Sequence, residues 1–161
     1  MDEISKLREQ LAFHLSGQGA HIDFDAAVEG LPFDLTGKQV PNLAHTAWHL
    51  VYHLQIAQRD ILEFCRNPAY LSPEYPSGYW PKDRAAESEE QWLETIAAFR
   101  LDLGAIIDLV KDPDNDLFAP FTHGSGQNLL REAILIIDHN SYHIGQLVDI
   151  RMLLEVPVRD W

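Results

Sequence analysis

The sequence predicts an all-α protein, a four-helix bundle whose helices are joined by long connections. Apolar residues recur every three or four positions along four long stretches, which is the period of an amphipathic helix. No stretch alternates apolar and polar residues between turn signals, as a half-buried strand would. Four amphipathic helices bury their stripes by packing against one another, so we expect a single bundle domain over residues 1–161.

The first helix is expected at residues 2–16, where the glycines that follow end it. Its apolar stripe is formed by Ile4, Leu7, Leu11 and Leu15. A short helical turn is expected near residues 23–30, ahead of Pro32. It lies inside the first long connection, residues 17–41.

The second helix is expected at residues 42–66, ending before Pro68. Its stripe consists of Leu43, Ala47, Leu50, Leu54, Ala57, Ile61 and Phe64. The connection 67–86 contains four prolines, but it also keeps aromatic residues with which to pack, so it is expected to be an ordered loop. A loop of this length can carry the chain back along the bundle, which would make the second and third helices parallel.

The third helix is expected to begin at Ser88, which would form a capping box with Gln91, and to stop at Asp112. Its stripe consists of Trp92, Ile96, Phe99, Leu103, Ile107 and Val110. The fourth helix is expected at residues 127–155, after a connection at 112–125 that is rich in turn residues. Its stripe consists of Leu129, Ala133, Ile136, Leu147, Ile150 and Leu154.

Composition and charge limit the partners of the chain. The formal net charge of −13 repels nucleic-acid phosphates and anionic lipid surfaces, so we expect neither nucleic acid nor a membrane as a partner. Cys65 is the only cysteine, which excludes an intrachain disulfide. The polar residues 1–8 do not resemble a signal peptide, and no apolar run approaches the ~20 residues of a membrane span. We therefore expect a cytoplasmic protein that acts on a small molecule.

Histidines on the second predicted helix differ in the direction in which they should point. Each residue of an α-helix advances about 100° around the axis. By this arithmetic His53 lies about 70° from the centre of the apolar stripe, His49 about 110° and His45 about 150°. His53 should therefore point toward the interior, and His45 should face solvent. The direction of His49 stays open.

On the fourth predicted helix, His143 lies about 30° and His139 about 70° from the stripe centre. Because they are four residues apart, their imidazoles can converge on one point, as in the H-x-x-x-H arrangement of zinc helices. A neutral imidazole offers a lone pair to a divalent metal without adding charge to a core. Such an i,i+4 pair also arises by chance, and a single histidine on an apolar face is usually a hydrogen-bonded core residue.

Five other residues are candidates for a supporting role near this site. Glu132 is expected to be a charge at the core rim, and Gln146 either a boundary residue or the lining of an open metal position. Tyr142 should project away from the stripe and pack elsewhere. His123, in a glycine-rich turn, could lean over the site but is expected to lie on the surface. Cys65 has only Arg66 as a basic neighbour and is not expected to be a nucleophile.

Several segments resemble one protein family. Residues 48–62, WHLVYHLQIAQRDIL, look like the second-helix motif of the DinB/YfiT-like superfamily, bacterial four-helix bundles unrelated to the DNA polymerase of that name. Residues 138–147, DHNSYHIGQL, closely resemble its fourth-helix signature. Residues 79–81, 123–127 and 129–133 are similar to segments of one branch. The resemblance extends from the first helix to about residue 154.

This resemblance implies a three-histidine site for a divalent metal, commonly zinc or nickel, with one ligand from the second helix and two from the fourth. Carried to this sequence, the ligands are His53, His139 and His143. A histidine-only site does not distinguish zinc, nickel and iron. Relatives include transferases that use low-molecular-weight thiols, isomerases and hydrolases. His45 and His49 are not part of the family pattern, so the second predicted helix offers three histidines from which its one ligand could come.

Two functions are compatible with these observations. In the first, the protein is a metal-dependent enzyme, either a thiol S-transferase or a hydrolase acting on a small molecule. In the second, it is a non-catalytic bundle that binds a metal or a small ligand. An enzyme keeps an open coordination position, whereas a structural site is closed by a fourth protein ligand, for which only His49 is a candidate. A homodimer is also expected, with residues 70–80 or Trp161 as contact surfaces.

Overall fold

The computed structural model describes residues 2–158, which form an all-helical structure with six α-helices, one 3₁₀ helix and no strand. The helices are α1 (Glu3–Leu15), α2 (Phe24–Val28), α3 (Phe33–Thr36), α4 (Ala47–Arg66), η1 (Ser77–Tyr79), α5 (Glu89–Lys111) and α6 (Leu129–Leu153). The all-α prediction is therefore confirmed. The helix α3 was not predicted, and it begins directly after Pro32, which sets the backbone at its N-terminus.

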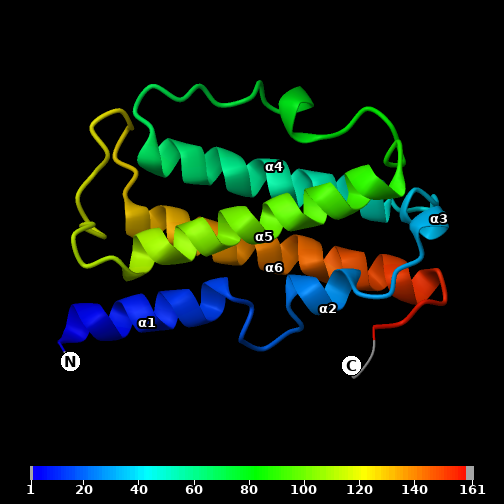
Figure 1. Ribbon diagram of the computed structural model, residues 1–161, viewed down its shortest axis with the longest axis horizontal. Coiled ribbons are helices and arrows are strands. Elements are labelled where there is room, and N and C mark those ends of the chain that lie inside the picture. The colour runs from blue at the N-terminus through cyan, green and yellow to red at the C-terminus, as the bar shows by residue number, and fades with distance from the viewer. Residues whose placement is uncertain (1, 159–161) are drawn as a thin grey trace.

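The long helices lie side by side along one axis (Figure 1). Helix α4 packs against α5 and α6, and α1 packs against the same two helices from the other side. In Figure 1 the chain follows α4 and α5 in the same direction, and α6 returns in the opposite one. The connection after α4 runs back along the whole molecule, so the second and third predicted helices are parallel, as its length suggested.

Helix α4 begins five residues later than predicted, at Ala47. Asn42 adopts the left-handed conformation with φ of 66°, which ends any helix that would include it. Thr46 has extended backbone angles, and its hydroxyl accepts a hydrogen bond from the backbone N–H of His49. The helix therefore starts where Thr46 caps it, and His45 lies outside the helix on which its predicted direction depended.

The cap of α5 also differs in part from the prediction. Ser88 is the N-cap, and its hydroxyl accepts from the N–H of Gln91 at 3.2 Å. The side chain of Gln91, however, accepts from the N–H of Glu87 at 2.7 Å rather than from that of Ser88. Helix α6 begins two residues into the predicted range, with Asn128 as its N-cap.

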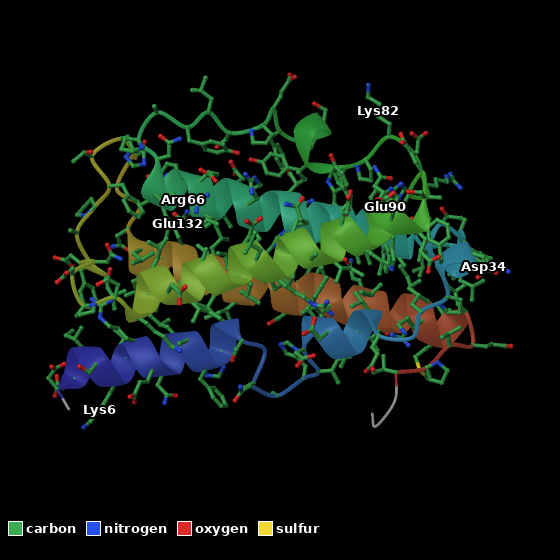
Figure 2. All side chains as sticks on the ribbon, viewed as in Figure 1. Lys6, Asp34, Arg66, Lys82, Glu90 and Glu132 are labelled. Atoms are coloured by element: carbon green, nitrogen blue, oxygen red, sulfur yellow. The ribbon has the colours of Figure 1, made fainter. Side chains whose placement is uncertain are left out.

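The core lies between α4, α5 and α6 and extends under α1 and α2. Its largest fully buried side chains include Leu50, Leu54, Phe99, Ile136, Leu147 and Ile150. Charged side chains lie mostly outside, as Lys6, Asp34, Lys82 and Glu90 show in Figure 2. Arg8 is an exception, because its guanidinium is buried and donates to the carbonyls of Val110 and Asn115, which fixes α1 to the end of α5. No helix of residues 2–158 has the length and apolar character that crossing a bilayer requires.

Candidate metal centre

Three histidines from two helices meet in the interior. His53 comes from α4, and His139 and His143 come from successive turns of α6. One ring nitrogen from each histidine lies within 4.8 Å of those of the other two. His53 and His143 are buried and His139 is half-buried. These are the three residues that helical phase and the family resemblance had singled out.

Hydrogen bonds behind two of the rings fix which nitrogen faces the centre. The Nδ1 of His53 lies 3.0 Å from the carbonyl oxygen of Tyr79, and the Nδ1 of His143 lies 2.6 Å from Oε1 of Gln146. A carbonyl oxygen only accepts, so each Nδ1 must carry the proton. The Nε2 of a neutral ring then holds a lone pair, and it points into the cluster. Such outer hydrogen bonds are characteristic of histidines that bind metals.

Two of the nitrogens at the centre are so close that a proton or a metal ion must lie between them. Nε2 of His53 and Nε2 of His139 are 3.0 Å apart. Because the proton of His53 is on Nδ1, two bare lone pairs would face each other unless His139 carries its proton on Nε2. A cation between the rings would serve the same purpose. The donor set therefore suits a divalent ion, and His139 only needs to move its proton to Nδ1 to become a ligand.

Burial keeps the rings neutral. It lowers the pKa of His53 and of His139 from 6.5 to about 4 each, and the neighbouring histidines add to the shift in both cases. Burial also lowers the pKa of His143. A histidine must be neutral to bind a metal, so the three rings are ready as ligands at pH 7 without losing a proton to solvent.

Trp80 forms a wall of the site that the sequence did not reveal. Its indole stacks on the imidazole of His53, with centroids 3.8 Å apart and planes 6° apart, and meets His143 edge-on. The same indole also stacks on His45, with centroids 4.1 Å apart and planes 9° apart. The prediction that His45 faces solvent is therefore wrong, because the half-buried ring of His45 covers Trp80. The only signal in the sequence was the Tyr-Trp-Pro segment at 79–81.

The loop that carries Trp80 is held to α4 by a second contact. The hydroxyl of Tyr79 donates to Oδ2 of Asp60 at 2.7 Å, while the carbonyl of the same residue accepts from His53. Asp60 lies seven residues after His53 on α4. Tyr79 thus ties the loop at two points, and these contacts place Trp80 over the histidines.

His49 has a structural role at the start of α4. Its Nδ1 lies 3.4 Å from the backbone N–H of Thr46, completing a capping box with the Thr46 hydroxyl. It does not belong to the three-histidine group. Among the histidines of the second predicted helix, His53 is therefore the one that approaches the pair on α6.

The remaining predicted helpers lie in different surroundings. Gln146 touches the site through His143 and orients that ring, rather than lining an open position. Glu132 is buried at 2% exposure and pairs with Arg131, so its prediction as a rim charge is wrong (Figure 2). His123 is half-buried and contacts the carbonyl of Phe64 at 2.8 Å, about three helical turns beyond His53, so it does not lean over the site.

The prediction for Tyr142 holds only in part, and Cys65 behaves as the sequence predicted. Tyr142 lies away from the core, but at 64% exposure it does not pack against another part of the described structure. Burial raises the pKa of the Cys65 thiol to about 12, which makes it a poor nucleophile.

Comparison of the chain with protein-family models, curated proteins and solved structures gives no match. A function is therefore inferred from the residues of this chain.

Proposed function

We propose that this protein is a metal-dependent enzyme of the DinB/YfiT-like type, in which α1, α4, α5 and α6 form the four-helix bundle and His53, His139 and His143 hold one divalent ion. The observation that carries the proposal is the convergence of three ring nitrogens within 4.8 Å from two facing helices. Building metal sites from facing helices is typical of bundles. Zinc and nickel are the first candidates, and iron is compatible with the same donors.

An open coordination face favours catalysis over a structural role. In residues 2–158, the group that could hold an ion contains three histidines and no fourth histidine, cysteine or carboxylate. His49, the one candidate for closing the site, is engaged in the capping box. Structural zinc sites have four protein ligands, whereas catalytic sites have three and leave a position for substrate. The non-catalytic metal- or ligand-binding bundle is the alternative that assays must exclude.

The chain's own residues would prepare the site in three ways. Tyr79 and Gln146 hold the protons of His53 and His143 on the outer nitrogens, so that the inner nitrogens are free. Trp80 covers His53 and limits the access of water from that side. A bound divalent ion supplies Lewis-acid chemistry, lowering the pKa of a water or thiol so that its anion can attack an electrophile at neutral pH. The family resemblance favours transfer to or from a low-molecular-weight thiol over hydrolysis.

Metal binding by untagged protein tests the first part of the proposal. The protein is stripped with a chelator and titrated with Zn²⁺ or Ni²⁺ by calorimetry. We expect one ion per chain for the unaltered protein and no measurable binding for His53→Ala or His143→Ala. His14→Ala, at an exposed position on α1, should bind as the unaltered protein does. Equal loss in His14→Ala, or retention in His143→Ala, would contradict the assignment.

Activity tests the second part. The metal-loaded protein is assayed with a panel of low-molecular-weight thiols combined with electrophiles, and with ester and amide substrates. We expect turnover that disappears on chelation and in His143→Ala. Binding of one ion without turnover across the panel would favour the alternative of a non-catalytic bundle. Turnover that persists in His143→Ala would exclude the metal mechanism.

The homodimer stays a prediction. Leu71 and Tyr75, within residues 70–80, are 87% and 83% exposed, while Tyr79 and Trp80 of that segment are used inside the chain. Trp161 lies outside the described residues. Light scattering at micromolar concentration distinguishes a dimer from a monomer, and a monomer would contradict the prediction of a homodimer.

A further inference from the structure

The three clustered histidines differ in what lies behind their rings. Nδ1 of His53 donates to the carbonyl of Tyr79, and Nδ1 of His143 donates to Oε1 of Gln146. For His139, the one ring contact of hydrogen-bond length within residues 2–158 is that of its Nε2 with Nε2 of His53, at 3.0 Å. Nδ1 is therefore the nitrogen of His139 for which an outer partner has to be found.

Asn140, the next residue on α6, carries a buried oxygen beside this ring. The residue is 8% exposed, and its Oδ1 is buried without a hydrogen-bond partner in the described structure. Buried polar atoms in native proteins nearly always have a partner, so this one calls for an explanation. Burial lowers the pKa of His139, and the interaction of its ring with the Asn140 side chain opposes part of that shift. An acceptor beside a ring N–H has this effect.

Two hydrogen bonds fix which atom of Asn140 is the acceptor. Nε2 of Gln58 donates to the carbonyl of Phe99 at 2.7 Å, and Nδ2 of Asn140 donates to Oε1 of Gln58 at 3.0 Å. The carbonyl of Phe99 only accepts, so Gln58 must turn its NH₂ group toward it and its oxygen toward Asn140. Asn140 therefore turns its own NH₂ group to Gln58. Its Oδ1 is left as an acceptor that needs an N–H or O–H group.

The tautomer of His139 decides whether this acceptor is satisfied. With the proton on Nε2, the ring can donate to His53, but its Nδ1 is then a second acceptor beside Oδ1 of Asn140. With the proton on Nδ1, the ring can donate to Oδ1, and the lone pair of Nε2 faces the cluster. The change exchanges one ring proton for another through solvent and leaves the charge unaltered. It satisfies the buried oxygen and frees the third ligand nitrogen together.

We propose that Asn140 is a positioning residue of the metal centre, whose Oδ1 accepts the Nδ1 proton of His139 and so holds Nε2 of that ring as a ligand. This role rests on the proposed metal-binding function. It gives the third histidine the outer acceptor that Tyr79 and Gln146 give the other two. Such partners fix the orientation of a ligand ring and strengthen it as a ligand. Through Gln58, the partner of His139 is also attached to α5, which supplies no ligand.

Two variants at position 140 isolate the acceptor. Asn140→Leu and Asn140→Asp both remove the donor to Gln58, but only Asn140→Asp keeps an oxygen that can accept from His139. Competition with a chromophoric chelator should show Zn²⁺ bound roughly 10–100-fold more weakly by Asn140→Leu than by the unaltered protein. Asn140→Asp should bind at least as tightly as the unaltered protein. Equal affinities of the two variants would overturn the proposal.

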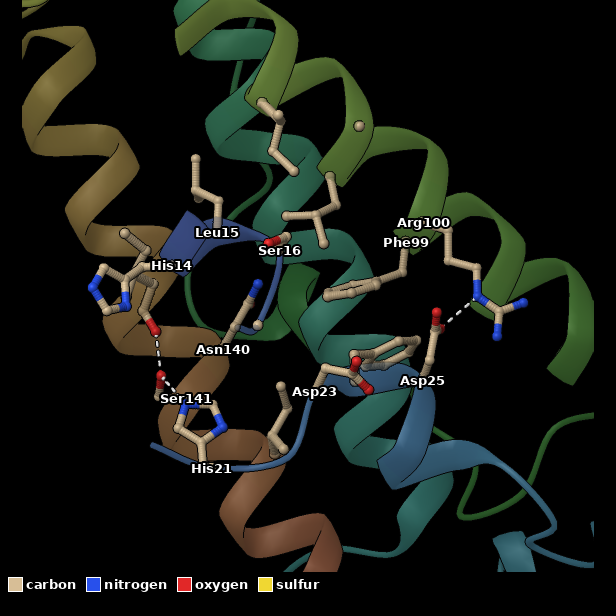
Figure 3. A pocket seen from close by; sticks show the side chains of 17 residues that line it. His14, Leu15, Ser16, His21, Asp23, Asp25, Phe99, Arg100, Asn140 and Ser141 are labelled. Atoms are coloured by element: carbon tan, nitrogen blue, oxygen red, sulfur yellow. Dashed lines mark hydrogen bonds and ion pairs between the residues drawn. The ribbon is translucent and has the colours of Figure 1, made fainter. Parts of the chain in front are cut away.

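Ser141 provides a control at the next position of α6. Its hydroxyl donates to the carbonyl of Ile137 at 2.7 Å and lies 2.8 Å from Nε2 of His21, in the connection from α1 to α2 (Figure 3). None of these partners belongs to the three-histidine group. Ser141→Ala should therefore bind Zn²⁺ as the unaltered protein does. A loss equal to that of Asn140→Leu would show that any change in this turn of α6 disturbs the site, and would overturn the role of Asn140.

NMR of the full chain with ¹⁵N-labelled histidine reports the ring protons directly, and His139→Ala assigns the signals. In the metal-free protein we expect the proton of His139 on Nε2. With Zn²⁺ it should be on Nδ1 and exchange slowly with solvent, because it is held by a buried acceptor. In Asn140→Leu this exchange should be faster. Fast exchange in the unaltered protein would overturn the proposal even if Asn140→Leu does not fold, as would an Nε2 proton in the Zn²⁺-loaded ring.

The same titrations separate this proposal from the proposed function. Absence of Zn²⁺ binding by the unaltered protein would contradict the metal centre and the role of Asn140 together. Zn²⁺ binding that is equally tight in the unaltered protein and in Asn140→Leu would contradict the role of Asn140 alone. Binding that is weakened in Asn140→Leu and retained in Asn140→Asp would support both.

Discussion

The indole ring of Trp80 lies parallel to the imidazole of His53, with 3.8 Å between ring centroids. One residue comes from a loop and the other from α4, and the loop is held there by the contacts of Tyr79 with both His53 and Asp60. The orientation of His53 thus depends on a segment that precedes α5 and contributes none of the three clustered histidines. The stacked pair also excludes solvent from one side of the cluster.

Replacing Trp80 with Leu should weaken both the fold and the site. The variant loses two stacking contacts of a half-buried aromatic ring, for which we expect a loss of about 1–3 kcal/mol in the free energy of unfolding. Metal affinity should fall because His53 becomes more mobile. Urea unfolding and metal titration measure the two effects. Trp80→Phe, which keeps a stacking ring, should lie between Trp80→Leu and the unaltered protein; equal affinity in all three would show that the stack does not position His53.

Gln146 should matter for metal affinity although it is not a ligand. Its Oε1 holds the Nδ1 proton of His143, so Gln146→Leu should weaken metal binding roughly 10–100-fold. Gln146→Glu keeps an acceptor at that place and should bind at least as tightly as the unaltered protein. Competition with a chromophoric chelator gives the affinities. Gln10→Leu, at an exposed position of α1, serves as the control and should change nothing. Equal affinity for Gln146→Leu and Gln146→Glu would argue against an orienting hydrogen bond.

Metal should stabilise the protein, and its removal should reverse the effect. An ion that binds only the folded chain, at a free concentration one hundred times its Kd, adds about 2.7 kcal/mol to the free energy of unfolding. We expect Tm to rise with Zn²⁺ or Ni²⁺ and to return after EDTA. His143→Ala should show no such rise. A rise of the same size in His143→Ala would indicate binding elsewhere.

Acid should destabilise the metal-free protein through the buried histidines. The pKa values of His53 and His139 are about 4 in the folded protein, against 6.5 ordinarily, so the unfolded chain binds more protons between these values. Their contribution to stability is complete above pH 6.5 and decreases as the pH falls toward 4. Urea unfolding in EDTA across this range measures the slope. The double variant His53→Ala, His139→Ala should have a shallower slope between pH 6.5 and 4; an identical slope would contradict the assignment.

The sequence located the three clustered histidines because the property that sorts them, helical phase, is local. His139 and His143 need only an intact α6, and their phase is set by residues within two turns. His45 was wrongly predicted to face solvent because α4 begins later than its apolar pattern indicates. The left-handed residue Asn42 and the N-cap Thr46 determine that later start. The burial of Glu132 was predicted wrongly because helical phase gives the direction of a side chain, but not how deeply neighbouring elements cover that side chain.

Trp80 and Asn140 could not have been found in the same way. The position of Trp80 depends on the path of an irregular loop, which tertiary contacts of Tyr79 determine. The buried hydrogen bond from Asn140 to Gln58, and the one from Gln58 to the backbone carbonyl of Phe99, join three different helices. Both features join segments far apart in the chain, and periodicity carries no information about such pairings.

The connection between the parallel helices α4 and α5 is longer than the distance between the two helix ends requires. Helix α4 is about 30 Å long, whereas residues 67–88 would reach about 70 Å if extended. Roughly ten residues would therefore suffice to join the two helices. The additional residues form η1 and the Tyr79–Trp80 segment, whose Trp80 packs on His53. This segment therefore has two roles, which are to connect the helices and to place Trp80 over His53. A shortened loop would separate them, because it could still connect the helices without covering His53.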